Sequence, residues 1–440
     1  MANPLDLIDT IVVVMMENRS FDHVLGFLSH ESFDGRKDVD GLRQHSPDFD
    51  WDNSDDDGEM YAPTATPDCY VPQDMPHGRD EIATQMNHGS MLGFINSYFA
   101  YQKVDRSPVP MRFCRPECIP ITAALARNYT VCDRWFASIP DDTFPNRLMS
   151  LSGYTNIDDT SVVKPPLHLL PDQTTIFDWL NNKHKTYKIY VDANPITNVG
   201  PPASMLLMEN QWGNVIRNAH TLDTLAGHWN NAPAPDVIYC EPFFNDFATA
   251  IGVHGNCNHP PLPMAYGELF LKKVYTALTS NPARWARTML IICYDEHGGF
   301  FDHVAPPAMT YGPPKGSRWL QPKPFDTLGI RVPSMIVSPL VDAKTASHDL
   351  FDHTSILQLM VEKFGTPADL AYFGDAPNRK NSGIRSLATA LTRQVPRMDD
   401  ILTLPDPPPP AGPATTPSIS QVAEIFRQVI ALAPKLKLGL

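Results

Sequence analysis

Residues 10–18, TIVVVMMEN, and residues 288–296, TMLIICYDE, decide the fold of this chain. Each stretch is a run of apolar, largely β-branched residues that stops at two polar side chains. Near-continuous apolar runs of this length are typical of strands buried on both faces of a sheet. We therefore predict two central strands whose carboxyl ends carry acids and an amide.

Other apolar runs extend this pattern along the chain. Further buried strands are expected over residues 186–191, 236–240 and 333–337, and amphipathic helices over residues 119–128, 174–182, 264–279 and 353–364. Strands that alternate with helices predict an α/β fold with a central, mostly parallel sheet and helices on both faces.

We expect one catalytic domain over residues 1–385, followed by a tail. Within the domain, residues 31–68 are rich in acids and predict a surface insertion. A Ca²⁺ loop is the weaker alternative there, because the spacing lacks the glycine and terminal glutamate of an EF-hand. Residues 386–418 predict a proline-rich linker, and residues 419–440 an amphipathic tail helix that packs on the body or on a second subunit. Packing on a second subunit would form a homo-oligomer. Contact of this helix with a membrane is the weaker alternative.

Composition disfavours several classes of protein. The formal net charge of −14 argues against a nucleic-acid partner, which needs basic patches. No apolar run approaches the about 18–20 residues of a transmembrane segment. The N-terminal stretch lacks the basic region and cleavage site of a secretory signal, so we expect a cytoplasmic protein, or a secreted or periplasmic one if a leader has been removed.

The seven cysteines do not have the spacing of a disulfide scaffold. Cys114 and Cys118 could form a pair, but two unrelated thiols in a loop are the expectation. Cys293 lies inside an apolar run and is interpreted as a buried core thiol.

The two acidic strand ends predict a single site, because ligands of open α/β sheets lie beyond the carboxyl ends of strands. Glu17, Asn18, Asp295 and Glu296 would present three carboxylates and one amide to the same crevice. Unpaired buried carboxylates are costly, so we expect a divalent cation between them. Oxygen ligands favour Ca²⁺, with Mg²⁺, Mn²⁺ or Zn²⁺ as alternatives. The competing interpretation is that each pair only caps the helix that follows it.

A candidate nucleophile lies in residues 139–154, IPDDTFPNRLMSLSGY, where Thr143 occupies a proline-bounded turn. A hydroxyl becomes a nucleophile when a metal or a base lowers its pKa, although a lone threonine in a turn is usually structural. Spacing alone does not choose among the 15 histidines for acid–base work. The candidates are His77, His259 and His303.

Several blocks of the chain resemble, in order, those of the bacterial and plant phosphoesterase family, which contains the non-specific phospholipases C and a group of acid phosphatases. They are MMENRSFDHVLGFL (15–28), HGRDEIATQMNHGSMLGF (77–94), TFPNRLMSLSG (143–153), YDEHGGFFDHVAPP (294–307), GIRVPSMIVSP (329–339) and FDHTSILQLMVEKFG (351–365). The resemblance runs from about residue 8 to residue 366. It implies a fold similar to that of the alkaline phosphatase superfamily.

The resemblance also implies roles for the candidate residues. It implies a catalytic metal surrounded by Glu17, Asn18, Thr143, Asp295 and Glu296, with Thr143 as the nucleophile. His77 and His259 would contact the phosphate and the leaving group, and His303 would face the phosphate; the expected substrate-binding residues are Asn146, Arg147 and Asn258. One departure stands out: where family members often have Asp-Asp-His-Pro, this chain has Cys257-Asn258-His259-Pro260. An expected carboxylate beside His259 is therefore an amide.

The function expected from these residues and this resemblance is metal-dependent phosphoester hydrolysis. Thr143 would attack phosphorus, a histidine would protonate the leaving alkoxide, and water would hydrolyse the phosphothreonine. The favoured activity is a phospholipase C that cleaves phosphatidylcholine-type phosphodiesters to diacylglycerol and a phosphorylated head group. The alternatives are an acid phosphatase-like phosphomonoesterase and, from another class, a catalytically degenerate metal- or phosphate-binding protein. A sulfatase is disfavoured because the Cys-x-Pro-x-Arg pattern is missing.

Overall fold

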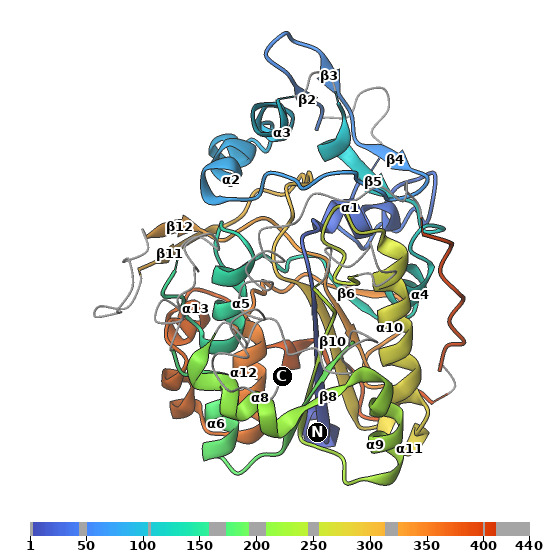
Figure 1. The fold of residues 1–440 in the computed structure, drawn as a ribbon, viewed down its shortest axis with the longest axis vertical. Coiled ribbons are helices and arrows are strands. Elements are labelled where there is room, and N and C mark those ends of the chain that lie inside the picture. Colours follow the sequence, from blue (N-terminus) through green and yellow to red (C-terminus); the bar gives the residue numbers. More distant parts are fainter. Residues whose placement is uncertain are drawn as a thin grey trace, which may run out of the picture.

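An eight-stranded sheet runs through the centre of the molecule (Figure 1). In spatial order its strands are β14 (Thr345–Ser347), β6 (Thr130–Cys132), β13 (Met335–Val337), β10 (Thr288–Tyr294), β1 (Thr10–Met16), β9 (Val237–Glu241), β7 (Tyr187–Val191) and β8 (Ala219–Thr221). Strand β13 runs antiparallel to both of its neighbours, and the other neighbouring pairs are parallel. The predicted mostly parallel central sheet is confirmed.

The structure is a computed structural model that describes residues 3–43, 51–103, 107–157, 173–192, 208–244, 255–312, 324–398 and 401–410. The tail helix expected over residues 419–440 and the end of the expected linker lie outside these ranges. Within them, no helix combines the length and the apolar character needed to cross a membrane.

Strands β1 and β10 form the middle of the sheet, and every residue of both is buried. Complete burial agrees with their near-continuous apolar sequences, because both faces of the sheet are covered by helices. Their register pairs Met16 with Tyr294. The residues that follow, Glu17 and Asp295, therefore leave the sheet at the same level.

Helices cover both faces of the sheet, with α5, α6, α12 and α13 on one side and α4, α9, α10 and α11 on the other in Figure 1. The helices are α1 (Phe21–Leu25), α2 (Arg79–Met86), α3 (Phe94–Gln102), α4 (Pro120–Asn128), α5 (Thr143–Ser152), α6 (Ile176–Asn182), α8 (Trp212–Asn218), α9 (Leu225–Asn231), α10 (Met264–Thr279), α11 (Pro282–Trp285), α12 (Thr354–Phe364) and α13 (Ala376–Asn381). The four helices predicted from amphipathic stretches correspond to α4, α6, α10 and α12.

Smaller elements lie above the carboxyl ends of the central strands, where α2, α3, β2 and β3 gather at the top of Figure 1. The two-stranded sheets are β2 (Asn53–Ser54) with β3 (Met60–Tyr61), β4 (Thr64–Thr66) with β5 (Arg112–Cys114), and β11 (Ala308–Tyr311) with β12 (Phe325–Thr327). The acidic segment over residues 31–68 thus contributes three short strands, and within it Val39 and Leu42 are buried in the main core.

The cysteines correct one sequence prediction. Cys69 and Cys114 form a disulfide across a sequence separation of 45 residues, and Cys118 is a free, buried thiol. The two alternatives considered for Cys114, a bond to Cys118 or a free thiol, are therefore both wrong. Cys69 reaches Cys114 because β4, which ends at Thr66, pairs in parallel with β5. Cys293 is buried and free, as predicted.

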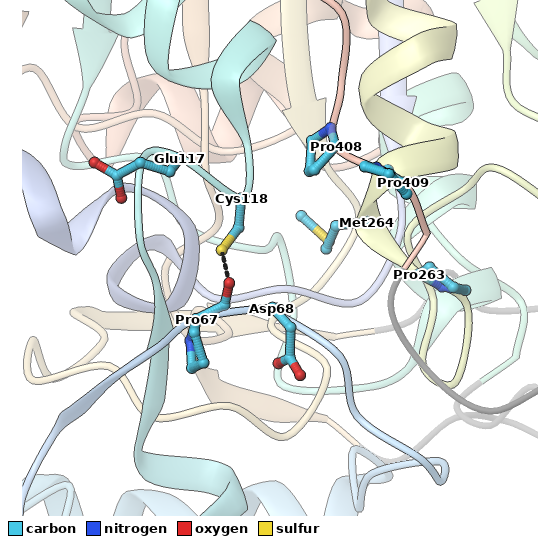
Figure 2. A pocket seen from close by; sticks show the side chains of 9 residues that line it. Pro67, Asp68, Glu117, Cys118, Pro263, Met264, Pro408 and Pro409 are labelled. Carbon is cyan, nitrogen blue, oxygen red and sulfur yellow. Dashed lines mark hydrogen bonds between the residues drawn. The ribbon is translucent and has the colours of Figure 1, made fainter.

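A cavity of about 130 Å³ lies between the segment that precedes α4 and the start of α10 (Figure 2). Its lining residues are Pro67, Asp68, Glu117, Cys118, Pro263, Met264, Ala265, Pro408 and Pro409. The proline-rich segment reaches it by running along α10, where Lys272 pairs with Asp406 at 2.6 Å. The lining of this cavity and the predicted site residues have no member in common.

Candidate active site

The two acidic strand ends meet in space. The backbone N–H of Asn18 donates to Asp295 Oδ1 at 3.1 Å, and the N–H of Arg19 donates to the carbonyl of Glu296 at 3.1 Å. Glu17, Asn18, Asp295 and Glu296 are all buried. Adjacent parallel strands that end in register bring these residues together, as expected for the carboxyl edge of an α/β sheet.

Thr143 joins this group from the first position of α5. Its hydroxyl Oγ1 lies 3.4 Å from Glu17 Oε1 and 3.3 Å from Asn18 Oδ1. Helix α5 begins here because Asp142 has an extended backbone, so the chain turns into the helix directly at Thr143. The hydroxyl is therefore held at a helix N-terminus and beside the carboxyl end of β1.

Asn146 holds the turn that precedes Thr143. Its side-chain oxygen accepts from the N–H of Ile139 at 3.1 Å, and its Nδ2 donates to the carbonyl of Asp141 at 2.8 Å. Both ends of the amide are thus engaged with the turn. This geometry supports a role in shaping the site, and substrate contact by Asn146 stays a prediction.

Arg147 lies one helical turn after Thr143 and neutralises part of the acidic cluster. Its Nε donates to Asp295 Oδ2 at 3.0 Å and its Nη2 donates to the carbonyl of Met16 at 3.1 Å. The guanidinium also lies over the ring of Phe244, 4.6 Å from the ring centroid. Both members of the ion pair are buried, so Arg147 is firmly placed beside the metal-ligand candidates.

The remaining negative charge is poorly compensated. Burial, reinforced by the nearby Asp295, raises the pKa of Glu17 to about 7. Burial also raises the pKa of Glu296 well above its ordinary value. Glu296 Oε1 is buried and has no hydrogen-bond partner among the described residues. Buried carboxylates with an unpartnered oxygen are the arrangement that a bound cation would stabilise.

His77 and His259 lie beside this cluster. His77 Nε2 is 3.2 Å from Asn18 Nδ2, and the centroids of the two imidazole rings are 5.6 Å apart. Burial would lower the pKa of His77, but the carboxylates of Glu296, Asp74 and Asp142 raise it to about 9. The raised pKa favours the protonated imidazole, which suits a proton donor.

Asp74 is a site residue that the sequence interpretation missed. Its Oδ1 lies 3.9 Å from His77 Nδ1 and 3.6 Å from His259 Nε2. These three side chains form a group with metal-ligand spacing. The Asp-x-x-His spacing in DMPH was the available signal for the contact with His77, whereas the contact with His259 joins distant parts of the chain.

Asn258 turns its side chain toward the sheet. Its Nδ2 donates to the hydroxyl of Tyr294 at 2.7 Å, and its carbonyl accepts from Arg19 Nε at 2.9 Å. The residue has a positive φ of 79°. Its Oδ1 faces Gly267 of α10, where an added Cβ would lie only 1.9 Å away. Substrate binding by this amide stays a prediction.

His303 lies in a second cluster. Its Nδ1 is 2.6 Å from Asp22 Oδ2 and its Nε2 is 3.3 Å from Asp40 Oδ1. Arg331 pairs with Asp22 at 3.1 Å and with Asp302 at 2.8 Å in the same group. Although Asp22, Asp302 and His303 have metal-ligand spacing, the guanidinium already supplies the positive charge. A catalytic role for His303 stays a prediction.

Most of this chain is similar to known proteins. The phosphoesterase family matches residues 8–367. Non-specific phospholipase C6 of Arabidopsis thaliana is 30% identical over 420 residues, which cover 91% of this chain and 76% of that protein. Phospholipase C B of Mycobacterium tuberculosis is 29% identical over 414 residues, which cover 82% of this chain and 74% of that protein.

Among solved structures, the chain is similar to a protein in the alkaline phosphatase superfamily from Vibrio parahaemolyticus. That similarity has a TM-score of 0.31 and 9% identity and covers 56% of this chain and 61% of the other. Phosphonate monoester hydrolase of Agrobacterium radiobacter gives a TM-score of 0.35 and 11% identity and covers 82% of this chain and 76% of the other.

The chain belongs to the phosphoesterase family. It is a phospholipase C-like hydrolase acting on phosphoric ester bonds.

Proposed function

We propose that this protein is a metal-dependent phospholipase C that cleaves phosphatidylcholine-type phosphodiesters to diacylglycerol and a phosphorylated head group. The observation that carries the proposal is the position of the Thr143 hydroxyl, 3.4 Å from Glu17 and 3.3 Å from Asn18 at a buried acidic strand edge. The names of the plant and mycobacterial relatives support a phospholipid substrate.

A divalent cation would be held by Glu17, Asn18, Thr143, Asp295 and Glu296. These residues fit such an ion because they offer only oxygen donors and because Glu296 Oε1 has no hydrogen-bond partner in the described ranges. A hard, oxygen-only ligand set favours Ca²⁺, with Mg²⁺, Mn²⁺ and Zn²⁺ as alternatives. When bound, the ion would lower the pKa of a hydroxyl and neutralise charge on the phosphate.

The chemical steps are carried by side chains of this chain. The Thr143 hydroxyl, which points to Glu17 Oε1 at 3.4 Å, passes its proton to that carboxylate as Oγ1 attacks phosphorus, and the proton returns to Thr143 when the phosphothreonine is hydrolysed. The attack forms the phosphothreonine, and the bond from phosphorus to the lipid alkoxide breaks. His77, whose Nε2 lies beside Asn18, gives its proton to the departing oxygen. Water then hydrolyses the phosphothreonine, with His259 or His77 as the base. Arg147, which lies one helical turn after Thr143, keeps Asp295 in place through their ion pair.

Thr143→Ala tests the covalent mechanism. We expect turnover to fall by about 10³-fold or more, because alanine lacks the hydroxyl that attacks phosphorus, while Thr143→Ser keeps measurable activity. Activity of Thr143→Ala at the level of the parent protein would exclude a phosphothreonine intermediate. Thermal unfolding of all three proteins provides the control for folding.

A kinetic comparison tests the substrate class. Hydrolysis of a short-chain phosphatidylcholine and of a simple aryl phosphate is measured at saturating divalent ion. A strong preference for the aryl phosphate would favour the acid phosphatase-like phosphomonoesterase over the phospholipase C. Absence of turnover with both substrates and every divalent ion would favour a metal- or phosphate-binding protein. The amide of Asn258, in place of the expected carboxylate, would then be one cause of the lost activity.

A further inference from the structure

Position 258 carries an amide, so the carboxylate that orients the imidazole of His259 must come from elsewhere in the chain. Asn258 cannot serve it in this conformation, because its Nδ2 donates to Tyr294 and its Oδ1 lies against Gly267. The imidazole of His259 is nevertheless buried, with 3% of its side chain exposed. A buried histidine that takes part in catalysis is normally oriented by a hydrogen bond or a charge on each side of its ring.

Asp74 reaches the same ring from a different part of the chain. Nδ1 of His259 contacts the carbonyl of Pro260, so its Nε2 is the nitrogen that faces Asp74 Oδ1 at 3.6 Å. His77 is arranged in a similar way, with Nδ1 at 2.5 Å from the carbonyl of Met75. Backbone carbonyls thus fix one edge of each ring, and one carboxylate lies close to both.

Asp74 is itself held in position. Its Oδ1 accepts from the backbone N–H of Met75 at 2.8 Å, and its carbonyl accepts from the side chain of Gln102 at the end of α3. Its side chain is 19% exposed, which places it at the rim of the buried cluster. The backbone of Asp74 is therefore tied to α3 and its carboxylate to the next residue, while His259 belongs to the segment before α10.

We propose that Asp74 is the positioning residue of this site: it fixes the His259 ring through Nε2 and, from the Nδ1 side, orients His77 so that its Nε2, beside Asn18, faces the oxygen of the leaving group. Asp74 thereby replaces the carboxylate that is missing at position 258. The inference rests on the proposed function. Asp74 acts through the two imidazoles and does not contact the reacting atoms. A divalent ion bound by Asp74, His77 and His259 is the competing account, because ligand atoms of the three lie within 4.8 Å of one another.

Asp74→Asn tests the proposal through the leaving group. With an alkyl phosphodiester, whose leaving group needs a proton, we expect kcat to fall by about 10–100-fold with KM changed by less than about twofold. With a 4-nitrophenyl ester, whose leaving group needs none, we expect a loss of less than about threefold. Asp74→Glu should recover part of the alkyl-ester activity. Asp80→Asn, the same change at an exposed position in α2, is the matched control and should behave as the parent.

Equal losses with both esters, or no loss with either, would overturn the proposal. Crystal structures of the parent and of Asp74→Asn, grown with Mn²⁺, give a second measurement that does not depend on activity. We expect the His259 ring to rotate in the variant; an unmoved ring, or an anomalous peak between Asp74, His77 and His259 in the parent, would exclude the orienting role. A parent protein without phosphoesterase activity would refute the proposed function, and the ring position would still decide the role of Asp74.

Discussion

At the scale of single residues, the site is defined by three buried carboxylates, one of which, Glu296, has an oxygen without a hydrogen-bond partner among the described residues. Glu17, Asp295 and Glu296 are buried together, and Arg147 is the guanidinium that pairs directly with one of them. Arg147 balances one of the three carboxylates, and besides it the imidazole of His77 interacts electrostatically with Glu296. Without a cation, some of these groups must be protonated or remain as costly buried charges.

Glu296→Gln is a residue-scale prediction about this balance. In metal-free buffer we expect the variant to be as stable as the parent or more stable by about 1–3 kcal/mol, because a buried charge with an unpartnered oxygen is removed. Adding a divalent ion should then stabilise the parent much more than the variant. Thermal unfolding with and without Ca²⁺ measures both effects. Equal stabilisation of the two proteins by the ion would contradict the assignment of Glu296 as a ligand.

At the scale of elements, packing of α10 against the segment that carries His259 requires a residue without a Cβ, Gly267. Gly267 lies within α10, and a Cβ at this position would lie 1.9 Å from Asn258 Oδ1 and 2.5 Å from its Cγ. Asn258 directly precedes His259 and is buried, so it has little room to move. A side chain at position 267 would therefore displace Asn258 and, with it, His259.

Gly267→Ala is therefore expected to lower both stability and activity. An alanine normally stabilises a helix interior relative to glycine by about 1 kcal/mol, but here the clash should reverse the sign and cost about 1–3 kcal/mol. Displacement of Asn258 should also move His259 and reduce turnover. Gly227→Ala in α9 is the matched control, since a Cβ there meets no atom within 4 Å. Denaturant unfolding and turnover of both variants check the prediction, which fails if both glycines respond alike.

At the scale of the whole molecule, the cluster around His303 connects four parts of the chain. Asp22 comes from α1, Asp40 comes from the acidic segment, and His303 follows the loop after β10. Trp51 of the acidic segment also lies against the imidazole, with ring centroids 4.3 Å apart. Arg331 completes the group by donating to Asp22 and to the carbonyl of Asp40.

This cluster predicts a pH dependence of stability. Burial would lower the pKa of His303, but Asp22 and Asp40 raise it to about 9. A raised histidine pKa contributes stability that is fully present below about pH 6.5 and is lost as the pH rises through 9. We expect about 1–3 kcal/mol of stability to depend on this group.

His303→Gln should remove that part of the pH dependence, whereas His88→Gln, at an exposed position, should keep it. Urea unfolding between pH 6 and pH 10 measures the difference. Parallel profiles for parent and His303→Gln would contradict the structural role. Loss of turnover in His303→Gln without loss of stability would instead support the catalytic role predicted from the family resemblance.

The amino-acid sequence by itself determined the central strands, the main helices and the acidic strand ends. A run of apolar residues indicates a buried strand directly, so β1 and β10 begin and end where the apolar runs do. The meeting of the two acidic strand ends could also be predicted, because parallel neighbouring strands end at one edge of a sheet. These features depend on local patterns and on one general rule of topology.

Contacts between distant segments were decided only by the tertiary structure. The bond between Cys69 and Cys114 depends on the pairing of β4 with β5, two strands too short to leave a periodic signal. The approach of Asp74 to His259 depends on how loops lie above the sheet, and polar loop residues carry no pattern that reports their partners. Burial leaves a pattern of apolar residues in the sequence, but a contact between two polar side chains leaves none. For that reason the metal-ligand candidates at the ends of two buried strands were predictable. Asp74, the residue proposed to orient the histidines, was not.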